Sequence, residues 1–283
     1  MEHIKSIILE DPTVKIVLII HFMGIPQEID NLSGMLSKKG IYLIEDCAQA
    51  LFARFKDGNS VGSKGDAAFF SLPKILPVPD GGLVIVNNPD IRLEKFASSR
   101  SVLHLLSIWF HLVNLLLKEL EHRFRKRWCR RAINIFCKLL YGGYYLSMRH
   151  QISPSRMSSV TMRILTNIDY KEFIRKRSEN ARLIHSGLDQ SKVRLLIPEL
   201  KENFFLTGIP VLSEKRDRMI EQLRALEIDC LSYSRAWLCE NANEYPFENI
   251  YCHQHLLLPV HEELTRDQIE YMIRSLNSLG NRR

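Results

Sequence analysis

Residues 14–46 read VKIVLIIHFMGIPQEIDNLSGMLSKKGIYLIED, and this stretch decides the fold class. Residues 14–20 form an apolar, β-branched run, which is typical of a strand buried on both faces of a parallel sheet. A loop with Gly and Pro follows, and then an amphipathic helix that stops at Gly40. Residues 41–46 form a second short apolar strand that ends in two acids. A strand, a helix and a strand within about 30 residues make a βαβ unit, which predicts a parallel α/β sheet.

The α/β pattern continues along the chain in two parts. Short elements up to residue 90 complete a dense core, and a helical region from 157 to 188 is followed by a strand and two amphipathic helices. The expected later elements are strands within 67–72, 81–88 and 202–212, and helices within 213–228 and 265–279. We therefore predict a large domain at 1–100, an apolar and basic helical segment at 101–156, and a helix with a small C-terminal α/β domain at 157–283.

The charge of the chain is regional. The net charge is +7, but residues 118–131 alone hold seven Lys/Arg and two Glu, a local +5. The remainder of the chain is nearly neutral, so we expect no nucleic-acid partner. The six cysteines show no CxxC pair, which indicates a reducing compartment, and we expect no metal site. No signal peptide is recognisable, and we expect a cytoplasmic protein.

Residues 101–117, SVLHLLSIWFHLVNLLL, are strongly apolar and run into the basic stretch. One interpretation is a helix that packs against the core or a dimer partner. The other is an amphipathic helix on an anionic membrane surface, with the contact made by residues 101–131 at the inner membrane face. The sequence leaves both interpretations open.

Two residues with functional chemistry follow the second strand. Asp46 stands at its carboxyl end, where open α/β sheets bind ligands, and a carboxylate there needs a positive partner. The protonated ring nitrogen of pyridoxal phosphate (PLP) is one such partner, because an acid keeps that nitrogen protonated. Gln49, three residues further on, could face the same ligand if the chain turns after the strand.

Lys74 lies in FFSLPKILPVPDGGLVIV, residues 69–86, between two apolar runs. Its frame contains three prolines and a Gly-Gly pair, which restrict the backbone and permit close approach of a ligand. A lysine held in this way can form a Schiff base with an aldehyde cofactor. Ser71, just before the frame, could donate its hydroxyl to a cofactor phosphate.

These motifs carry a family resemblance. IIHFMGIPQEID, YLIEDCAQALFARFKDGNSVGSKGDAAFFSL, KILPVPDGG and LLLPVHEELTRDQIEYMI occur in this order and cover most of the chain outside 100–150. Together they resemble the DegT/StrS family of PLP-dependent nucleotide-sugar aminotransferases. The resemblance implies the aspartate-aminotransferase-like fold (fold type I), with residues 1–100 as part of the PLP-binding domain.

The resemblance also implies a reaction and a site. Members act as homodimers and move an amino group from glutamate to a keto-sugar nucleotide in polysaccharide or modified-sugar biosynthesis. By the resemblance, Asp46 faces the pyridine nitrogen, Gln49 the ring hydroxyl and Ser71 the phosphate, and Lys74 binds the cofactor covalently. Relatives with histidine in place of this lysine are dehydratases, so Lys74 favours transamination.

The sequence departs from the family pattern in three respects, one of which is Pro154 in SPSRMSS (153–159), where members carry an Asn that reaches across the dimer to the partner's phosphate. Members carry roughly a further hundred residues, a small domain's worth of chain, before the segment that matches KIVLIIHFMG. Only two residues separate Ser71 from Lys74, fewer than in many members. The alternative is therefore a shortened, non-catalytic homologue that acts as a partner subunit or as a membrane-surface module.

Overall fold

The computed structural model describes the chain except for residues 1, 94–101, 122–126, 150–155, 233–243 and 280–283. The described residues form two compact units. Unit 1 combines Met1–Phe70 with Asp169–Arg283, and unit 2 is Ser71–Ile168. The boundaries of these two units differ from those of the three-part division expected at 1–100, 101–156 and 157–283. That division stays a prediction.

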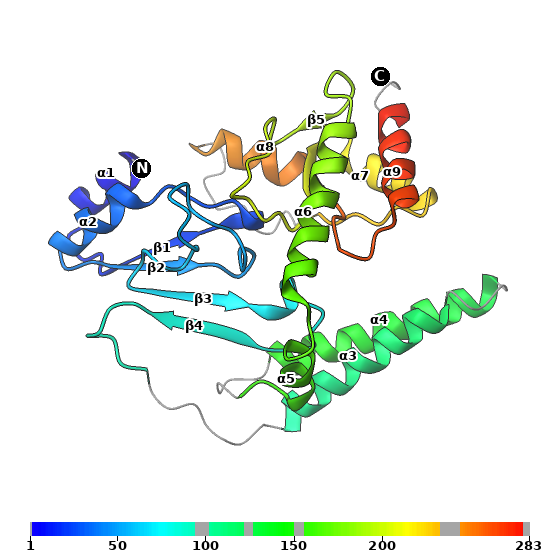
Figure 1. The fold of residues 1–283 in the computed structure, drawn as a ribbon, viewed down its shortest axis with the longest axis horizontal. Helices are drawn as coiled ribbons and strands as arrows, with labels where there is room; N and C mark the ends of the chain where they lie inside the picture. The colour runs from blue at the N-terminus through cyan, green and yellow to red at the C-terminus, as the bar shows by residue number, and fades with distance from the viewer. Residues whose placement is uncertain (1, 94–101, 122–126, 150–155, 233–243, 280–283) are drawn as a thin grey trace. The chain divides into compact units, whose positions relative to one another are not determined.

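The first half of unit 1 is the predicted parallel sheet with its crossover helix (Figure 1). Its elements are α1 (Glu2–Glu10), β1 (Ile16–Ile20), the 3-10 turn η1 (Phe22–Gly24), α2 (Asp30–Lys38), β2 (Tyr42–Asp46) and β3 (Ala67–Ser71). β1 pairs with β2 in parallel, with Ile16 opposite Tyr42, and β2 pairs with β3 in parallel. The βαβ prediction is confirmed.

Helix α2 is held on the sheet by an apolar stripe. Leu32 and Leu36, one turn apart, are fully buried, and so is Leu43 of the adjacent β2. Each such side chain contributes about 1.5–3 kcal/mol through burial. The helix ends just before Gly40, whose φ of +67° belongs to the left-handed region that glycine adopts without steric cost.

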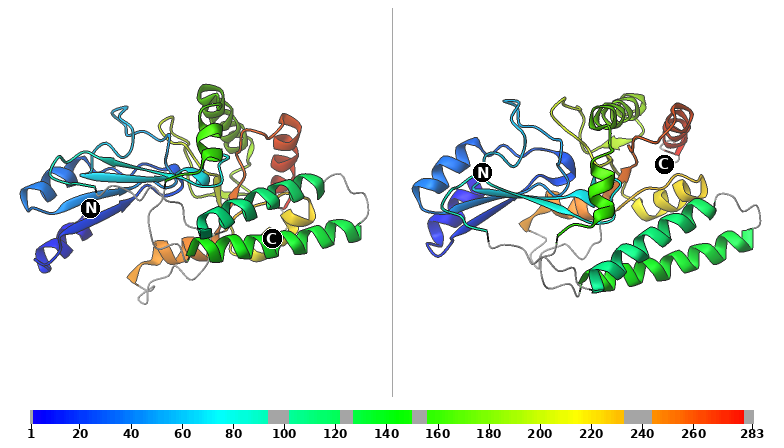
Figure 2. Two further views of the ribbon diagram at one scale, coloured as in Figure 1. Left: turned by 90° about the horizontal axis from the view of Figure 1, so that it is seen from below. Right: turned by 60° about the horizontal axis from the view of Figure 1, so that its bottom comes forward.

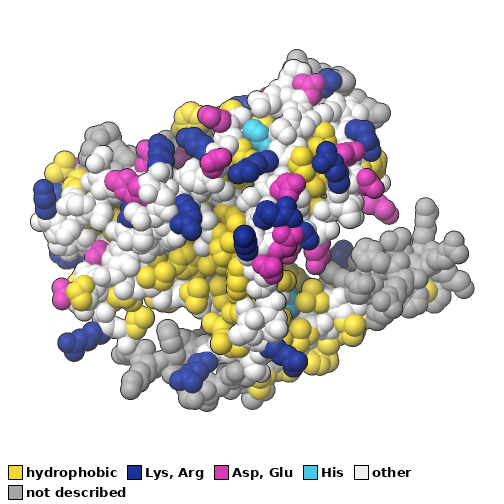
Figure 3. All heavy atoms as spheres, in the orientation of Figure 1, with side chains coloured by type: hydrophobic (Ala, Val, Ile, Leu, Met, Phe, Trp, Pro, Cys, Tyr) yellow, Lys and Arg dark blue, Asp and Glu magenta, His cyan; other side chains and the backbone are white. Residues whose placement is uncertain are grey.

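One face of this sheet is exposed. Ile16, Leu18 and Ile20 of β1 are 59%, 51% and 49% exposed, and Tyr42 and Phe69 on the neighbouring strands are also exposed. Figure 3 shows hydrophobic side chains gathered over the strands. The expectation that 14–20 is buried on both faces is therefore wrong for this chain. The apolar run correctly indicated a parallel strand, but coverage of its second face depends on elements that pack against it.

The second half of unit 1 is the predicted small α/β region. A three-stranded antiparallel sheet in the order β5-β6-β7 forms its centre, with Val211, Leu256 and Leu258 fully buried. Its elements are α6 (Tyr170–Gly187), β5 (Arg194–Leu195), β6 (Ile209–Leu212), α7 (Arg216–Ala225), α8 (Pro246–Gln254), β7 (His255–Leu258) and α9 (Arg266–Leu279). The strand expected within 202–212 is confined to its last four residues.

Gly24 joins the two halves of unit 1. The N–H of Phe205 donates to the carbonyl of Gly24 at 3.1 Å, and the N–H of Thr207 donates to that of Met23 at 3.1 Å. Gly24 has φ +82°, and a Cβ at this position would lie 1.9 Å from the carbonyl oxygen of Phe205. Only glycine permits this approach, which fixes the turn that follows β1.

Unit 2 begins with a tight turn and contains a long helical hairpin. Its elements are η2 (Leu72–Lys74), β4 (Gly82–Val86), α3 (Val102–Glu121), α4 (Arg127–Arg149) and α5 (Ser159–Leu165). Helices α3 and α4 lie side by side, seen as the paired green helices in both views of Figure 2. The helix expected at 101–117 is confirmed. Among the described helices, none combines the length and apolar character that crossing a bilayer requires.

Candidate functional site

The candidate site in unit 1 is built where β1 and β2 end. His21 follows β1 directly, and Glu45 and Asp46 are the last two residues of β2. The N–H of His21 donates to the carbonyl of Asp46 at 2.9 Å, so the strand ends are joined. Neighbouring residues of a strand point to opposite faces. Glu45 is accordingly fully buried, whereas Asp46 is half-buried.

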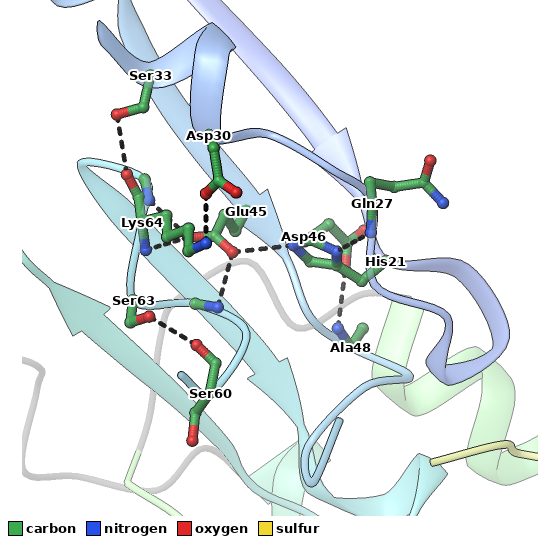
Figure 4. A network of polar contacts seen from close by, with 12 residues as sticks. His21, Gln27, Asp30, Ser33, Glu45, Asp46, Ala48, Ser60, Ser63 and Lys64 are labelled. Carbon is green, nitrogen blue, oxygen red and sulfur yellow. Dashed lines mark hydrogen bonds and ion pairs between the residues drawn. The ribbon is translucent and has the colours of Figure 1, made fainter. Parts of the chain in front are cut away.

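The Glu45 carboxylate accepts four hydrogen bonds (Figure 4). Its Oε2 accepts from Gly62 N–H at 2.7 Å and pairs with His21 Nε2 at 2.9 Å. Its Oε1 accepts from the backbone N–H groups of Lys64 and Gly65 at 2.8 and 2.5 Å. One carboxylate therefore anchors the 62–65 loop to the end of β2 and to the turn after β1.

The hydrogen bond at Nδ1 of His21 shows which ring nitrogen carries the proton. The N–H of Gln27 donates to His21 Nδ1 at 3.0 Å, so Nδ1 is the acceptor. A neutral imidazole carries one proton, which is then on Nε2 and is donated to Glu45. Both side chains are 0% exposed. The ring is thus fixed in orientation and in tautomer.

The pKa values of this cluster reflect its hydrogen bonds. Burial by itself would raise the pKa of Glu45, but the bonds from His21, Gly65, Gly62 and Lys64 outweigh it and lower the pKa below its ordinary value. Burial raises the pKa of the neighbouring Cys47 thiol, and the charges of Glu45 and Asp46 raise it further. Glu45 is therefore the ionised member and Cys47 a neutral thiol.

His21, Glu45 and Cys47 also satisfy the distance requirement for a metal cluster, with their ligand atoms within 4.8 Å of one another. Their chemistry favours a structural role instead. Both ring nitrogens of His21 and both oxygens of Glu45 are already hydrogen-bonded, and a metal ligand must be a thiolate rather than a neutral thiol. The cluster holds the strand ends in place.

Asp46 and Gln49 lie in the same turn after β2. The Oδ1 of Asp46 accepts the N–H of Ala48 at 2.9 Å, which fixes the carboxylate rotamer. Gln49 is buried, and its Oε1 accepts the N–H of Met23 at 2.9 Å. Met23 has a positive φ of 58°, so Gln49 supports a strained turn. The cofactor contacts assigned to Asp46 and Gln49 stay predictions.

In unit 2, Lys74 projects from a buried frame. It is the last residue of η2 and is exposed, whereas Leu72, Ile75 and Leu76 around it are at most 4% exposed. Hydrogen bonds from the N–H groups of Ile75 and Leu76 to the carbonyl of Leu72 close the turn. The apolar runs therefore pack inward and leave the amine outside. Ser71, the last residue of β3, is half-buried, and its phosphate contact is likewise untested.

Asp80 fixes the other end of this frame. Its Oδ2 accepts Ser158 N–H at 2.7 Å and its Oδ1 accepts Ser158 Oγ at 2.7 Å, while Thr161 Oγ1 also donates to the carboxylate. The N–H of Leu72 donates to the carbonyl of Gly81 at 3.2 Å and closes the loop. Sequence reasoning missed Asp80 because its partners lie 78 and 81 residues away.

The sheet region is similar to proteins of a known family. Residues 1–102 match the model of the DegT/DnrJ/EryC1/StrS aminotransferase family. An 87-residue stretch is 34% identical to a UDP-N-acetyl-3-dehydro-alpha-D-glucosamine 3-aminotransferase of Acidithiobacillus ferrooxidans. An 82-residue stretch is 37% identical to an L-glutamine:2-deoxy-scyllo-inosose aminotransferase of Streptoalloteichus tenebrarius. These stretches cover 30% and 28% of this chain, and 23% and 19% of the relatives. The resemblance predicted from the motifs is confirmed.

Solved structures extend the similarity to the whole chain at the level of the fold. The apo form of a putative sugar aminotransferase, Spr1654, from Streptococcus pneumoniae aligns with a TM-score of 0.65 and 15% identity. The alignment covers 99% of this chain and 71% of that protein. DesV of S. venezuelae aligns with a TM-score of 0.62 and 20% identity, covering 96% and 67%. The predicted fold class, α/β of the aspartate-aminotransferase-like type, is confirmed.

Proposed function

We propose that this protein acts as a PLP-dependent aminotransferase on a keto-sugar nucleotide. The observation that carries the proposal is Lys74, an exposed amine on a frame whose surrounding side chains are buried, in a chain whose first 102 residues match a family of aminotransferases. A surface lysine without a function does not require such a frame.

The donor set fits PLP. The cofactor needs an acid for its ring nitrogen and a lysine for its aldehyde, and when bound it supplies an electron-withdrawing ring for the chemistry at the substrate carbon. Asp46 has one oxygen engaged by Ala48 N–H, which orients the carboxylate. In the proposal Asp46 keeps the proton on the ring nitrogen, and Gln49 lies beside the ring hydroxyl. Ser71 contributes a hydroxyl to the phosphate.

Lys74 has two tasks in the proposal. Its amine would hold the cofactor's aldehyde in the resting protein, and when free it would serve as the base that moves a proton on the substrate. A lysine at the end of a short turn suits both tasks, because its four-carbon stem can swing while the backbone stays in place.

The amino donor, the assembly and the cellular setting are proposed from the family resemblance of the sequence. One curated relative is named for a 3-dehydro (keto) sugar nucleotide, and the other for L-glutamine and 2-deoxy-scyllo-inosose. We assign glutamate as the amino donor, a homodimer as the assembly, and polysaccharide or modified-sugar biosynthesis in the cytoplasm as the setting.

The test is covalent labelling rather than turnover. The purified chain is incubated with PLP, reduced with borohydride, digested, and analysed by mass spectrometry for a pyridoxyl group. We expect the label on the peptide with Lys74, and none there after Lys74→Arg, which keeps the charge. Lys215→Arg, a change at an exposed lysine of unit 1, should leave the label unchanged. Absence of label, or equal labelling of several surface lysines, would contradict the assignment.

A further inference from the structure

The basic charge of the chain is concentrated in unit 2. Residues 101–168 contain 11 Lys/Arg and two Asp/Glu, a net charge of +9, in a chain whose total is +7. The other 215 residues therefore carry −2. No Asp or Glu occurs between Glu121 and Asp169, a stretch that includes helices α4 and α5. Such segregation creates a local positive field that attracts an anionic partner.

Helix α3 presents an apolar stripe to solvent. Leu105, Trp109, Leu112 and Leu116 follow one another at helical spacing, and they are 51%, 55%, 37% and 60% exposed. Positions i, i+4, i+7 and i+11 lie on one face of a helix. Residues 101–117 contain no charged side chain. An uncharged apolar face of this length is not expected to be left in water.

The stripe is not the face that packs against α4. That inner face contains Ile108, at 7% exposure, and α4 contributes Cys137 and Leu140 at 4% and 5%. At Gly143, a Cβ would lie 3.1 Å from the ring of Phe110, so the helices approach closely there. The hairpin has therefore already buried one apolar surface.

Helix α4 also has an outer apolar line. Ile135, Leu139 and Leu146 are 57%, 67% and 57% exposed, and Lys138 beside them is exposed too. Both helices of the hairpin are thus apolar on two sides. An exposed apolar line of this length marks an interaction surface.

We infer that the α3–α4 hairpin, through helices α3 (Val102–Glu121) and α4 (Arg127–Arg149), binds the surface of an anionic lipid bilayer. The outer leucines, isoleucine and Trp109 enter the boundary between headgroups and acyl chains, and the net positive charge of the segment attracts it to anionic headgroups. Tryptophan is enriched at that depth in membranes. This binding does not depend on the proposed aminotransferase activity.

Charge and surface chemistry together favour lipid over the other partners. A nucleic acid would satisfy the basic side chains but leave the apolar stripes in water. A second copy would cover the stripes but would bring two segments of +9 together, and like charges repel. An anionic bilayer complements both features of the hairpin.

The experiment is flotation of the full chain with vesicles. Vesicles of phosphatidylcholine with about one third phosphatidylglycerol should carry the protein to the top of the gradient, and pure phosphatidylcholine should not. Leu105→Gln with Leu116→Gln should lower the partition coefficient more than tenfold. Its control, Leu18→Gln with Leu231→Gln, changes two leucines of unit 1 that are 51% and 64% exposed, and should have no effect.

The electrostatic part is tested separately. Neutralising Arg130, Arg131 and Lys138 to Gln should lower the partition coefficient about fivefold for each charge removed. The same neutralisation of Lys215, Arg218 and Arg224, which are exposed in unit 1, should change it little. Equal flotation with neutral vesicles, or equal effects of test and control variants, would overturn the inference. So would absence of flotation together with a dimer that Leu105→Gln and Leu116→Gln dissociate, which would assign the surface to a second copy.

Discussion

Glu45 in unit 1 and Asp80 in unit 2 are both buried carboxylates, 0% and 3% exposed, but their hydrogen-bond donors differ. Glu45 accepts from three backbone N–H groups and from His21. Asp80 accepts from one backbone N–H and from the hydroxyls of Ser158 and Thr161. Each supports a segment with a predicted cofactor residue, Asp46 in the first case and Lys74 in the second.

The difference shows how two equally buried acids can tolerate change differently. A backbone N–H can only donate, so it requires an acceptor opposite it. A hydroxyl can rotate and become an acceptor. Replacing the carboxylate by an amide turns one acceptor into a donor. At Glu45, the new amide N–H group would face a backbone N–H group, so two donors would meet. At Asp80, a hydroxyl can rotate and accept a hydrogen bond from the new amide N–H group.

The largest expected effect is that of Glu45→Gln. The amide cannot accept from all of its donors, and His21 loses its ionised partner, so the free energy of unfolding should fall by about 3 kcal/mol. Urea unfolding followed by circular dichroism measures this loss. Glu28→Gln, at a carboxylate whose side chain is 71% exposed, is the control and should change the stability by less than about 1 kcal/mol. An equally small loss for Glu45→Gln would show that the cluster is not needed for folding.

A smaller loss is expected for Asp80→Asn. The amide oxygen can still accept from Ser158 N–H, and the hydroxyls can reverse to accept from the amide, so about 1–2 kcal/mol should be lost. The same urea experiment compares it with Asp90→Asn at an exposed acid, which should be close to neutral. If Asp80→Asn were as damaging as Glu45→Gln, the distinction between backbone and hydroxyl donors would be wrong.

The smallest effect is a dependence on pH. The folded-state pKa of Glu45 is below its ordinary value of 4.5, so its stabilisation is fully present above pH 4.5 and is lost as the pH falls through the folded pKa. The stability difference between the wild type and Glu45→Gln should therefore shrink as the pH decreases from 5. Urea unfolding at a series of pH values measures it, and a difference that grows on acidification would contradict the lowered pKa.

Much of the fold could be predicted from local pattern. The apolar run at 14–20, the break at Gly40 and the strand at 41–46 predicted β1, α2 and β2 to within two residues. Elsewhere the local signal was weaker: the apolar stretch 50–55 contributes only an isolated bridge between Arg54 and Ser60. A short run next to glycines does not show whether a partner strand lies beside it.

The candidate site could be predicted only in part. Asp46, Gln49, Ser71 and Lys74 were singled out by chemistry and by resemblance, but the supporting acids Glu45 and Asp80 were not. The sequence does not show which of the two acids, Glu45 or Asp46, is buried. Alternation along a strand places them on opposite faces of the sheet, but it does not show which face is covered.

The sequence by itself determined the βαβ pattern, the family resemblance and the residue types available for catalysis, because these depend on neighbours along the chain. Only the tertiary structure decided that Glu45 pairs with His21 and that Ser158 joins Asp80. It also decided that β1 and the α3–α4 hairpin keep apolar faces in solvent. The reason is physical: burial and hydrogen bonding are properties of whatever packs nearby, and these two pairs lie 24 and 78 residues apart in the chain.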